Sequence, residues 1–589
     1  MSRTVADGLW EMLVSAGVRR CYGIVGDALN PVVDAMRRNG QVDFVHVRHE
    51  EFGVFAAVAE AKLTGRPVAV CGTAGPGVAH LINGMLDALK EEVPVIVLAG
   101  DTETRLTDSS TVEELNPYRF FASAAVYVGR LVNPAQLRTV VTSAVMAAVT
   151  RGGPAVVALP GDIAAADAPK DRYEIPLPRP VRAPAGAEDL SVMAEMINAA
   201  GTVAVFGGEG CAGAHAEVKA LAEKLSAPVG YSLKGKQFLE HDNANAVGMT
   251  GLLGYGGCHY ALQHADLLLM LGTDFPFSEF LPHGRTRVIQ VDRNPERLGR
   301  RVPVALGVTG DVRATVAELL PLVEPKADGA YLAHCVAETE RFHRRMRHYT
   351  DKGPRIKPIR PEYLATVLSD LADDDALFFA DTGTPVIWAA RHIKYGPRRR
   401  LFGSFSWASM ATASPGAFGA QLAFPGRQTI ALCGDGGFTM LALGDLLTEV
   451  QHRLPVVHIV LNNSSLDFVK IEQQEAGFVP FGTDLANPDF AAVAEALGAR
   501  GIRIEDPDDV EEGLAGALSH TGGPVVVDVL VDPYALAVPA HVPVGTAAGF
   551  TLSAARQVLA GRLDDVIETA THNARLIRPT TGPTKKDAR

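Results

Sequence analysis

The sequence predicts an α/β protein with three parallel-sheet domains followed by a helical tail. Strand-like apolar runs alternate with helical patterns along most of the 589 residues, which is typical of parallel sheets covered by helices. That length exceeds what one hydrophobic core can organise, so several domains are expected. Two blocks of the chain also read alike, which indicates one α/β module used twice.

The two similar blocks begin at Arg66 and Arg427. Each reads as a strand, a Cys-Gly pair, a glycine loop, a helix, a Pro-Val step and a second strand. They then close alike, with GGPAVVALP at 152–160 and GGPVVVDVLV at 522–531. Duplication of one module explains this shared order better than independent origin does.

A third α/β block, built from strands and glycine loops, lies between the two modules. A stretch rich in Pro and Ala at 175–189 reads as an extended linker before it, and a basic stretch at 341–361 reads as a second linker after it. We therefore expect domains at 1–174, 190–335 and 360–535, and a tail at 536–589.

Composition and charge exclude several classes of protein. The net charge of −12 gives no basic face for nucleic acid. The six cysteines form no CxxC pair, which argues against a zinc site or a disulfide framework and favours a reducing cytoplasm. We see no secretion-leader pattern at the N-terminus and no apolar run long enough to span a bilayer, so any membrane contact is expected to be peripheral.

Polar residues follow two strand-like runs of the C-terminal module. Asp435 follows TIALC, and Asn463 follows VVHIVL. If these strands are neighbours, both side chains project from the carboxyl edge of the sheet, where ligands bind in such folds. A carboxylate and an amide oxygen suit Mg²⁺, and Gly436 and Gly437 let phosphate approach the free N–H groups of the next helix. The structural alternative is a turn with Asp435 as helix N-cap.

The GDG and NN spacing resembles the signature of the thiamine diphosphate (ThDP) enzymes, and the likeness covers nearly the whole chain. It is closest to the branch of pyruvate oxidase and quinone-dependent pyruvate dehydrogenase in the segments RHEEFGVFAAVAEAKLTG, AGPGVAHLINGMLDA, VGMTGLLGY, GTPVIWAAR and GSFSWASM. The resemblance implies two duplicated ThDP-binding modules that flank a Rossmann-like FAD domain, with ThDP, Mg²⁺ and FAD as cofactors.

Carried over residue by residue, the resemblance implies a magnesium site formed by Asp435, Asn463 and the carbonyl of Ser465, with Asn462 the less favoured amide. The residues expected to contact ThDP in this module are Ala408, Ser409, Met410, Asp435, Gly436, Gly437, Asn463, Ser464, Ser465, Leu466, Asp467, Phe468 and Val469. Met410 matches the apolar residue that folds the coenzyme into a V, although a buried methionine is also common in cores.

Glu50 is the expected catalytic acid. It follows the strand DFVHV in the first turn of an apolar helix. In the family, the acid at this position hydrogen-bonds the aminopyrimidine ring and favours its imino tautomer. A glutamate that complements the helix dipole is the alternative, and Glu51 fits that alternative better. Phe468 and Glu472 are expected to roof the reactive carbon and face the flavin, with core and surface positions as their alternatives.

In the central block, Gly207, Gly210 and Gly213 are weak evidence for a dinucleotide. The resemblance gives stronger FAD contacts: Met249, Thr250, Gly251, Leu252, Gly272, Thr273, Asp274, Phe275, Pro276 and Asp292. Asp292 follows the strand RVIQV, where an acid can bind ribose hydroxyls. A vestigial central domain without flavin is the alternative.

Two segments depart from the family pattern. The run TVEE at 111–114 stands where an aromatic-Gln-Glu segment is frequent, which predicts a wider, more acidic pocket and weakens the assignment of pyruvate. Asp467 stands where a glycine is common. Both changes are expected to tune a 2-oxo acid pocket rather than abolish it.

The tail from Phe550 carries an apolar helical stripe with basic residues beyond it. The stripe consists of Leu563, Val566, Ile567, Ala570, Ala574 and Ile577. It resembles the helix with which quinone-dependent relatives bind membrane, and docking on its own subunit is the alternative.

The resemblance implies oxidative decarboxylation of pyruvate, or a similar 2-oxo acid, to acetate and CO₂ through a hydroxyethyl adduct of ThDP, with electrons passing through FAD to a membrane quinone. The alternatives are an acetolactate synthase-like carboligase, an oxidase that makes acetyl phosphate and H₂O₂, and a non-catalytic ThDP- or nucleotide-binding regulator. The resemblance also implies a homo-oligomer, at least a dimer and typically a tetramer. The expected location is the cytoplasm, with peripheral contact at the inner face of the cell membrane.

Overall fold

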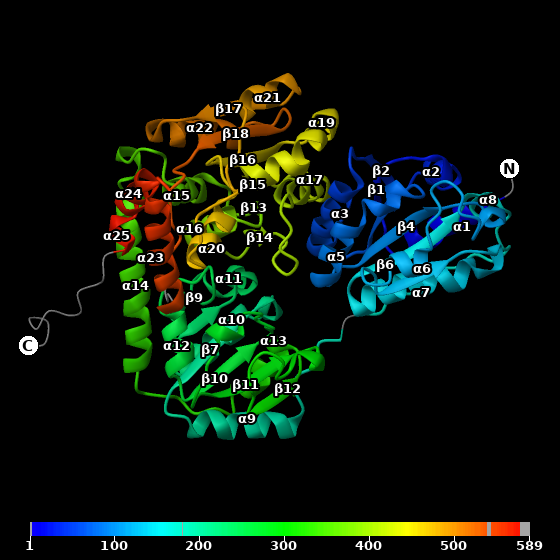
Figure 1. The fold of residues 1–589 in the computed structure, drawn as a ribbon. Coiled ribbons are helices and arrows are strands. Elements are labelled where there is room, and N and C mark those ends of the chain that lie inside the picture. The colour runs from blue at the N-terminus through cyan, green and yellow to red at the C-terminus, as the bar shows by residue number, and fades with distance from the viewer. Residues whose placement is uncertain (1–2, 180, 539–543, 578–589) are drawn as a thin grey trace, which may run out of the picture.

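The computed structural model describes residues 3–179, 181–538 and 544–577. Three six-stranded sheets, each covered by helices, are followed by a helical tail. All strand pairings within the sheets are parallel among the residues described. Figure 1 shows the N-terminal domain to one side of the central and C-terminal domains. The predicted fold class is confirmed.

The N-terminal domain is built on a sheet of order β2-β1-β3-β4-β6-β5. Its strands are β1 Arg20–Gly23, β2 Asp43–His46, β3 Val68–Gly72, β4 Val95–Asp101, β5 Tyr127–Arg130 and β6 Pro154–Pro160. Its helices are α1 Val5–Ser15, α2 Asn30–Asn39, α3 Glu50–Thr64, α4 Pro76–Ala79, α5 Ile82–Lys90, α6 Pro117–Phe120, α7 Leu137–Arg151 and α8 Gly161–Ala165. Every residue of β3, β4 and β6 is buried. Helices on both faces explain why these strands read as unbroken apolar runs.

The C-terminal domain has the sheet order β14-β13-β15-β16-β18-β17. Its strands are β13 Leu377–Ala380, β14 Arg400–Phe402, β15 Thr429–Gly434, β16 Val456–Asn462, β17 Arg500–Ile504 and β18 Val525–Leu530. Its helices are α15 Pro361–Leu371, α16 Thr384–His392, α17 Ala413–Ala423, α18 Asp435–Gly437, a π-helix Phe438–Ala442, α19 Leu443–His452, α20 Asp467–Glu475, α21 Phe490–Ala496 and α22 Val510–Leu518. Counted from the first strand of each domain, this order is the same as in the N-terminal domain, which supports duplication of one module.

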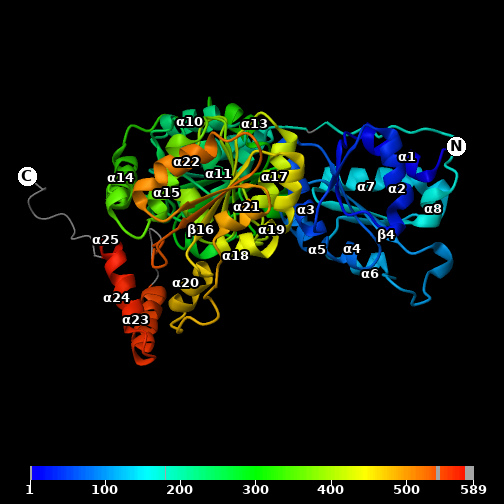
Figure 2. The ribbon, with the colours of Figure 1, turned by 90° about the horizontal axis from the view of Figure 1, so that it is seen from above.

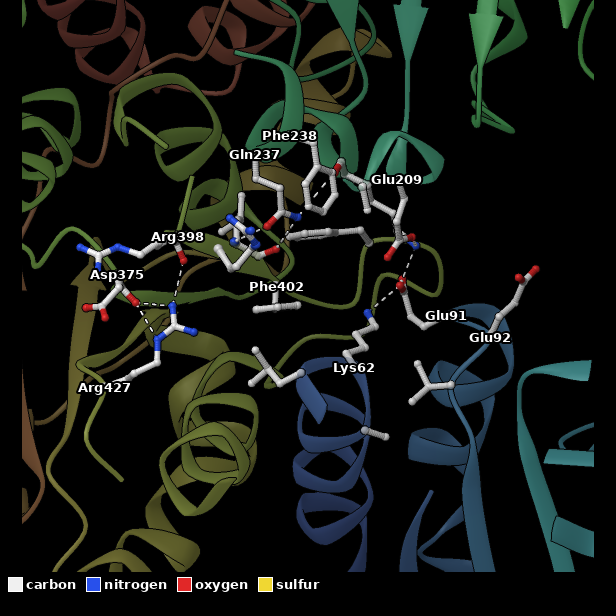
Figure 3. Close-up of a pocket in the computed structure, with 18 of the residues that line it drawn as sticks. Lys62, Glu91, Glu92, Glu209, Gln237, Phe238, Asp375, Arg398, Phe402 and Arg427 are labelled. Carbon is white, nitrogen blue, oxygen red and sulfur yellow. Dashed lines mark hydrogen bonds and ion pairs between the residues drawn. The ribbon is translucent and has the colours of Figure 1, made fainter. Parts of the chain in front are cut away.

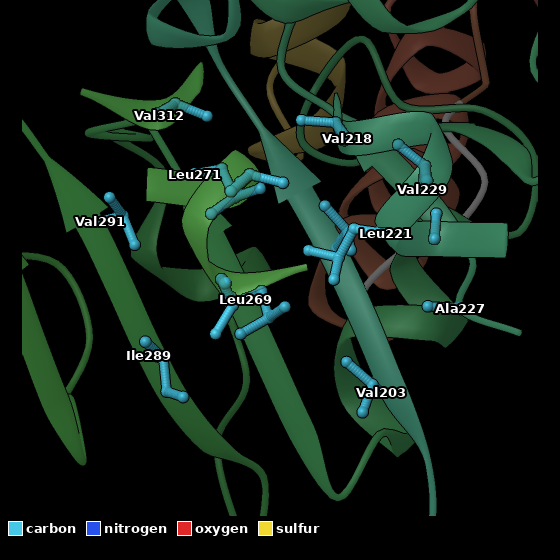
Figure 4. Close-up of a cluster of buried hydrophobic side chains, with 14 of the residues drawn as sticks. Val203, Val218, Leu221, Ala227, Val229, Leu269, Leu271, Ile289, Val291 and Val312 are labelled. Atoms are coloured by element: carbon cyan, nitrogen blue, oxygen red, sulfur yellow. The ribbon is translucent and has the colours of Figure 1, made fainter. Parts of the chain in front are cut away.

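The central domain has the sheet order β12-β11-β10-β7-β8-β9, which is the doubly wound Rossmann order. Its strands are β7 Val203–Gly207, β8 Val229–Tyr231, β9 Ala246–Met249, β10 Leu267–Leu271, β11 Arg287–Asp292 and β12 Leu306–Thr309. Its helices are α9 Ala187–Ala199, α10 His215–Lys224, α11 Leu233–Leu239, α12 Cys258–His264 and α13 Val312–Leu319. Figure 4 shows Val203, Leu269 and Ile289 of neighbouring strands in the buried layer beneath Val218 and Leu221 of α10.

Helix α14 (Ala330–Thr350) corrects the expectation of a linker from residue 341. Its buried residues are Cys335, Met346 and Tyr349. Charged residues lie between these buried positions in the sequence, and a basic run usually indicates a solvated segment, so the sequence pattern did not indicate the apolar side of the helix.

The tail forms three helices, α23 Val544–Leu559, α24 Leu563–His572 and α25 Ala574–Ile577. They dock on their own chain: Ser553 Oγ donates to the Phe478 carbonyl at 2.6 Å, and His572 Nδ1 lies 2.8 Å from Asp532 Oδ2. Figure 2 shows α20, α23 and α24 projecting together from the rest of the molecule. Across the three described ranges, no helix combines the length and apolarity that crossing a membrane requires.

The N-terminal and C-terminal domains contact each other through α3 and α17. These helices occupy equivalent places, since α3 follows β2 and α17 follows β14. Their backbones approach so closely at Gly419 that a Cβ there would lie 2.2 Å from the Ala56 carbonyl oxygen. Just before α3, the Arg48 backbone N–H donates to Asp445 of α19, so the start of α3 also contacts the C-terminal domain.

Candidate functional site

Asp435 and Asn463 lie at the same edge of the C-terminal sheet. Asp435 directly follows β15 and Asn463 directly follows β16, and these two strands pair with each other. The Asn463 backbone N–H donates to Asp435 Oδ2 at 3.2 Å. Asp435 is 2% exposed. Burial raises the pKa of its carboxyl, while hydrogen bonds from Gly436 N and Asn487 Nδ2 lower it.

Asn487 is a site residue that sequence reasoning missed. Its Nδ2 donates to Asp435 Oδ2 at 2.8 Å and to Asn462 Oδ1 at 2.9 Å. Asn462 is also engaged by Asp528, which accepts from its Nδ2 at 2.9 Å. The amide of Asn462 therefore belongs to the sheet interior, which leaves Asn463 as the amide available for a metal at the edge.

The geometry of the loop after β15 favours a site for Mg²⁺ and diphosphate over the alternative in which Asp435 is a helix N-cap. The N-cap of α18 is Gly434, and no side chain caps this helix. Ser465 Oγ and Asp381 Oδ2 are buried without hydrogen-bond partners within the described ranges. A Cβ on Gly437 would lie 2.3 Å from Asp381 Oδ2, so the loop has room only for glycine there. Carboxylate, amide and backbone oxygens form a hard-oxygen set of the kind that Mg²⁺ prefers.

The loop from Ser404 to Ala411 adopts a strained backbone. Ala408 has φ 62° and Ala411 has φ 63°, in the left-handed region that alanine rarely adopts. Between them, Met410 points its Cε to within 3.4 Å of where a Cβ on Gly436 would lie. The structure thus places the expected V-shaping residue beside the expected diphosphate loop.

Asn83 connects this loop to the N-terminal domain. Its Nδ2 donates to Glu51 Oε1 at 2.6 Å and to Ser409 Oγ at 3.0 Å, and its Oδ1 accepts from Trp407 Nε1 at 2.8 Å. Glu51 therefore positions a loop between domains, in addition to lying in the first turn of α3.

Glu50 has a different environment from its neighbour. It is 5% exposed, and its Oε2 lies 2.8 Å from His80 Nδ1. The carboxyl of Glu50 lies against Gly77 of α4: a Cβ on Gly77 would lie 3.3 Å from Glu50 Oε1 and 2.9 Å from Thr73 Cγ2. The Thr73 Oγ1 atom is buried without a hydrogen-bond partner in the described chain. No described contact within the chain joins Glu50 to Asp435 or Asn463.

Helix α20 carries the other residues predicted beside the reactive centre. Burial raises the pKa of Asp467 to about 7; Lys470 opposes this shift and the Asp435 carboxylate adds to it. Phe468 is half-buried against the C-terminal core, and Glu472 is exposed. In the single chain, Phe468 therefore lies in the core and Glu472 lies on the surface, as the structural alternatives for these two residues predict.

The central domain offers polar groups where a flavin nucleotide is expected. Asp292 is 3% exposed; its Oδ1 accepts from Asn294 N at 2.9 Å, while its Oδ2 has no hydrogen-bond partner among described residues. An unpartnered carboxylate oxygen after a Rossmann strand suits a ribose hydroxyl. Asp274 instead pairs with Arg300 and Arg301. Gly251 lies against the Phe275 ring, so the two expected flavin segments touch.

The TVEE segment lies beside α4. A Cβ on Gly75 would lie 2.8 Å from the Glu113 Cβ, and Val112 is 83% exposed. Asp108, Ser110 and Glu113 all have positive φ. Three such residues in one loop indicate a backbone held by its surroundings against local preference.

Asp445 ties the start of α3 to α19 and makes the junction sensitive to pH. Its Oδ1 accepts from Arg48 N at 2.7 Å and from Thr448 Oγ1 at 2.9 Å. Burial raises the pKa of Asp445 from 3.8 to about 6, against those hydrogen bonds. Because the folded chain holds this proton more tightly than the unfolded chain, the stability that the protonated form provides is lost as pH rises from about 4 to about 6.

The side chain of the Asp445→Asn variant is neutral at every pH, so the variant does not lose this stability as pH rises. Relative to the wild type, we expect it to gain about 3 kcal/mol in free energy of unfolding between about pH 4 and pH 7. Urea unfolding of both proteins across this range measures the difference. The matched control is Asp370→Asn, an exposed aspartate of the same domain, which should show no such trend. A variant-minus-wild-type difference that does not change with pH would refute the assignment.

Comparisons with known proteins agree with this arrangement. Models of the thiamine pyrophosphate enzymes match residues 3–120 (N-terminal TPP binding domain), 190–319 (central domain) and 381–529 (C-terminal TPP binding domain). The chain is 33% identical to "Putative thiamine pyrophosphate-containing protein YdaP" of Bacillus subtilis, over 93% of this chain and 95% of that protein. It is 30% identical to "Pyruvate oxidase" of Lactiplantibacillus plantarum, over 88% and 87%. It is 29% identical to "Acetolactate synthase large subunit" of Parasynechococcus marenigrum, over 89% and 87%.

Proposed function

The chain belongs to the thiamine pyrophosphate enzyme family, and on that premise we propose that it is a flavoprotein that oxidatively decarboxylates pyruvate or a similar 2-oxo acid. Its products are acetate and CO₂, and a membrane quinone receives the electrons. ThDP, when bound, supplies the carbon nucleophile and the electron sink for decarboxylation, and FAD supplies the two-electron acceptor.

The residues of this chain have separate roles in that reaction. Asp435, Asn463 and the Ser465 carbonyl would hold Mg²⁺, and through it the diphosphate. Asn487 orients the Asp435 carboxylate through its hydrogen bond to Oδ2, as partners of metal ligands commonly do. Glu50 would hold a proton for the pyrimidine nitrogen of the bound coenzyme. We propose, as the family resemblance implies, that the pyrimidine and diphosphate ends of one coenzyme are bound by different subunits, which makes the active unit at least a dimer.

The observation that carries the quinone branch is an exposed apolar surface beside α20. We call it the apolar tail surface; its residues are Phe478, Phe481, Leu552, Leu559, Leu563 and Ile567. Phe481 is 86% exposed and Leu559 is 87% exposed. Arg556 and Arg562 fasten α23 and its following turn to the carbonyls of Gly477 and Pro480. Exposed apolar patches of this kind mark contacts with partners or membranes.

The experiment follows flavin reduction and reoxidation in the absence of oxygen. The protein loaded with ThDP, Mg²⁺ and FAD is mixed with pyruvate, and we expect the flavin to bleach with release of acetate. A quinone in phospholipid vesicles should then reoxidise the flavin. In the double variant Phe481→Ser, Leu559→Ser, reoxidation by the vesicle quinone should slow by about tenfold or more, because two apolar side chains are lost from the membrane contact.

Ferricyanide, a water-soluble acceptor, is the control and should reoxidise the variant and the wild type equally. Equal rates with vesicle quinone would show that the apolar tail surface does not meet the membrane. Acetolactate without bleaching would identify a carboligase, and acetyl phosphate with H₂O₂ in aerobic phosphate buffer would identify an oxidase. Absence of any turnover would favour a regulator.

A further inference from the structure

A cavity of about 640 Å³ opens where the three domains meet. Its walls come from the end of α3 and the residues before β4, from α11 and the loop after β7, and from β14 with the residues that precede β13 and β15. Figure 3 shows side chains of all three domains pointing into this space. Its volume lies within the range typical of small-molecule sites.

One end of the cavity carries excess positive charge, because three arginines line it against one carboxylate, that of Asp375, whose charge acts on Arg427. This end is lined by Arg398, Arg400 and Arg427, and none of these three forms an ion pair with a carboxylate in the described parts of the chain. Arg427 Nε donates to the Asp375 carbonyl at 2.8 Å, and Arg400 donates to the Arg399 carbonyl at 2.7 Å. Burial lowers the pKa of Arg400, and the charge of Arg427 lowers it further.

The opposite end is neutral because its charges are paired. Lys62 and Lys234 lie 2.7 Å and 2.6 Å from Glu91 Oε2, and Lys234 lies 3.3 Å from Glu209. Burial would raise the pKa of Glu91, but the two lysines lower it to about 2. In Figure 3, Lys62, Glu91 and Glu209 lie on one side of Phe402, and Arg398 and Arg427 lie on the other.

Aromatic rings occupy the region between the two ends. Phe238, Phe402 and Phe405 line the cavity and are half-buried. The Arg400 guanidinium lies 5.4 Å from the centroid of the Phe238 ring. Phe402 stacks on Phe379 with 5.3 Å between ring centroids. These rings suit a flat aromatic group that lies between a cationic end and a neutral polar end.

We propose that this cavity binds a nucleoside diphosphate or triphosphate, with its phosphates on the arginines and its base against the phenylalanines. Guanidinium groups match phosphate oxygens in geometry as well as charge. None of the residues expected to hold Mg²⁺, ThDP or FAD lines the cavity, although Glu209 and Ala212 belong to the glycine loop at 207–213 of the central domain. The arginines belong to the C-terminal domain and Phe238 to the central domain, so an occupant joins these two domains and stabilises their arrangement, as an effector does.

Calorimetric titration with ADP tests the proposal on protein loaded with ThDP, Mg²⁺ and FAD. Arg400→Gln should weaken ADP binding by about tenfold or more, because a charge-assisted contact is lost. Phe238→Leu should weaken it by about threefold or more through the lost ring contact. Adenosine and pyrophosphate, titrated separately, should each bind more weakly than ADP, because each provides only part of the contact.

Two variants serve as matched controls. Arg344→Gln changes an exposed arginine on α14 outside the cavity and should leave ADP binding unchanged. Asp292→Asn should also leave it unchanged, whereas ADP bound in the expected flavin site would respond to that change. Absence of ADP binding, equal affinity for pyrophosphate and ADP, or a loss of affinity only in Asp292→Asn would each overturn the proposal. None of these readouts depends on turnover of a 2-oxo acid, so they stand apart from the test of the proposed function.

Discussion

Glu50→Gln should lower the turnover of the 2-oxo acid by about 10²–10⁴-fold, the usual contribution of a positioned acid or base. The Glu50 side chain is buried at the start of α3, with its Oε2 2.8 Å from His80 Nδ1. Glutamine keeps the size of the side chain and an acceptor for His80, but it cannot hold a transferable proton. Steady-state rates with a dye acceptor measure the loss, and titration with ThDP and Mg²⁺ should show a much smaller change in coenzyme affinity.

Glu51→Gln is the matched control for this prediction. Glu51 lies in the same first turn of α3, but its Oε1 accepts from Asn83, which also reaches Ser409. Glutamine preserves that acceptor, so turnover should change little. If both variants lose activity equally, the start of α3 acts through its structure, and Glu50 is not the acid of the reaction.

The shared sheet edge of Asp435 and Asn463 was predictable from local pattern. Asp435 and Asn463 each follow an apolar run, and neighbouring parallel strands bring such residues to one edge. Asn487 was not predictable, because it lies in an irregular segment before α21 and contacts Asp435 across 52 residues of sequence. No periodicity or spacing marks a residue that acts through a long-range hydrogen bond.

Packing between elements accounts for the other differences from the sequence-based expectations. The apolar stripe of the tail predicts one helix, but the structure has a break at Asn573 between α24 and α25. There Asn573 accepts from Leu536 N at 3.0 Å and donates to the Tyr534 carbonyl at 2.6 Å. The cavity at the domain junction depends in the same way on how three separately folded sheets are arranged, which a pattern within one segment does not encode.

Asp435→Asn should lower the affinity for Mg²⁺ by at least about 100-fold, since changes to the partners of metal ligands alone cost 10–100-fold. Three donors converge on this carboxylate: Gly436 N on Oδ1, and Asn463 N and Asn487 Nδ2 on Oδ2. An asparagine must turn its amide N–H₂ towards one of these sets of donors. The substitution therefore removes the negative charge that a divalent cation requires and also disturbs the hydrogen bonds that orient the remaining oxygen.

The measurement is the Mg²⁺ concentration at which ThDP raises the midpoint of thermal unfolding, since a ligand that binds only the folded state stabilises it more as its concentration exceeds its Kd. Asn487→Ala should give a smaller shift, about 10–100-fold, because it affects the carboxylate only through a hydrogen bond. Asp445→Asn, in the same domain but bonded to Arg48, should leave the Mg²⁺ requirement unchanged. A wild-type Mg²⁺ requirement in Asp435→Asn would show that the ion binds elsewhere. The roles proposed for Asn463 and Ser465 would then fail as well, because both depend on the same edge of the sheet.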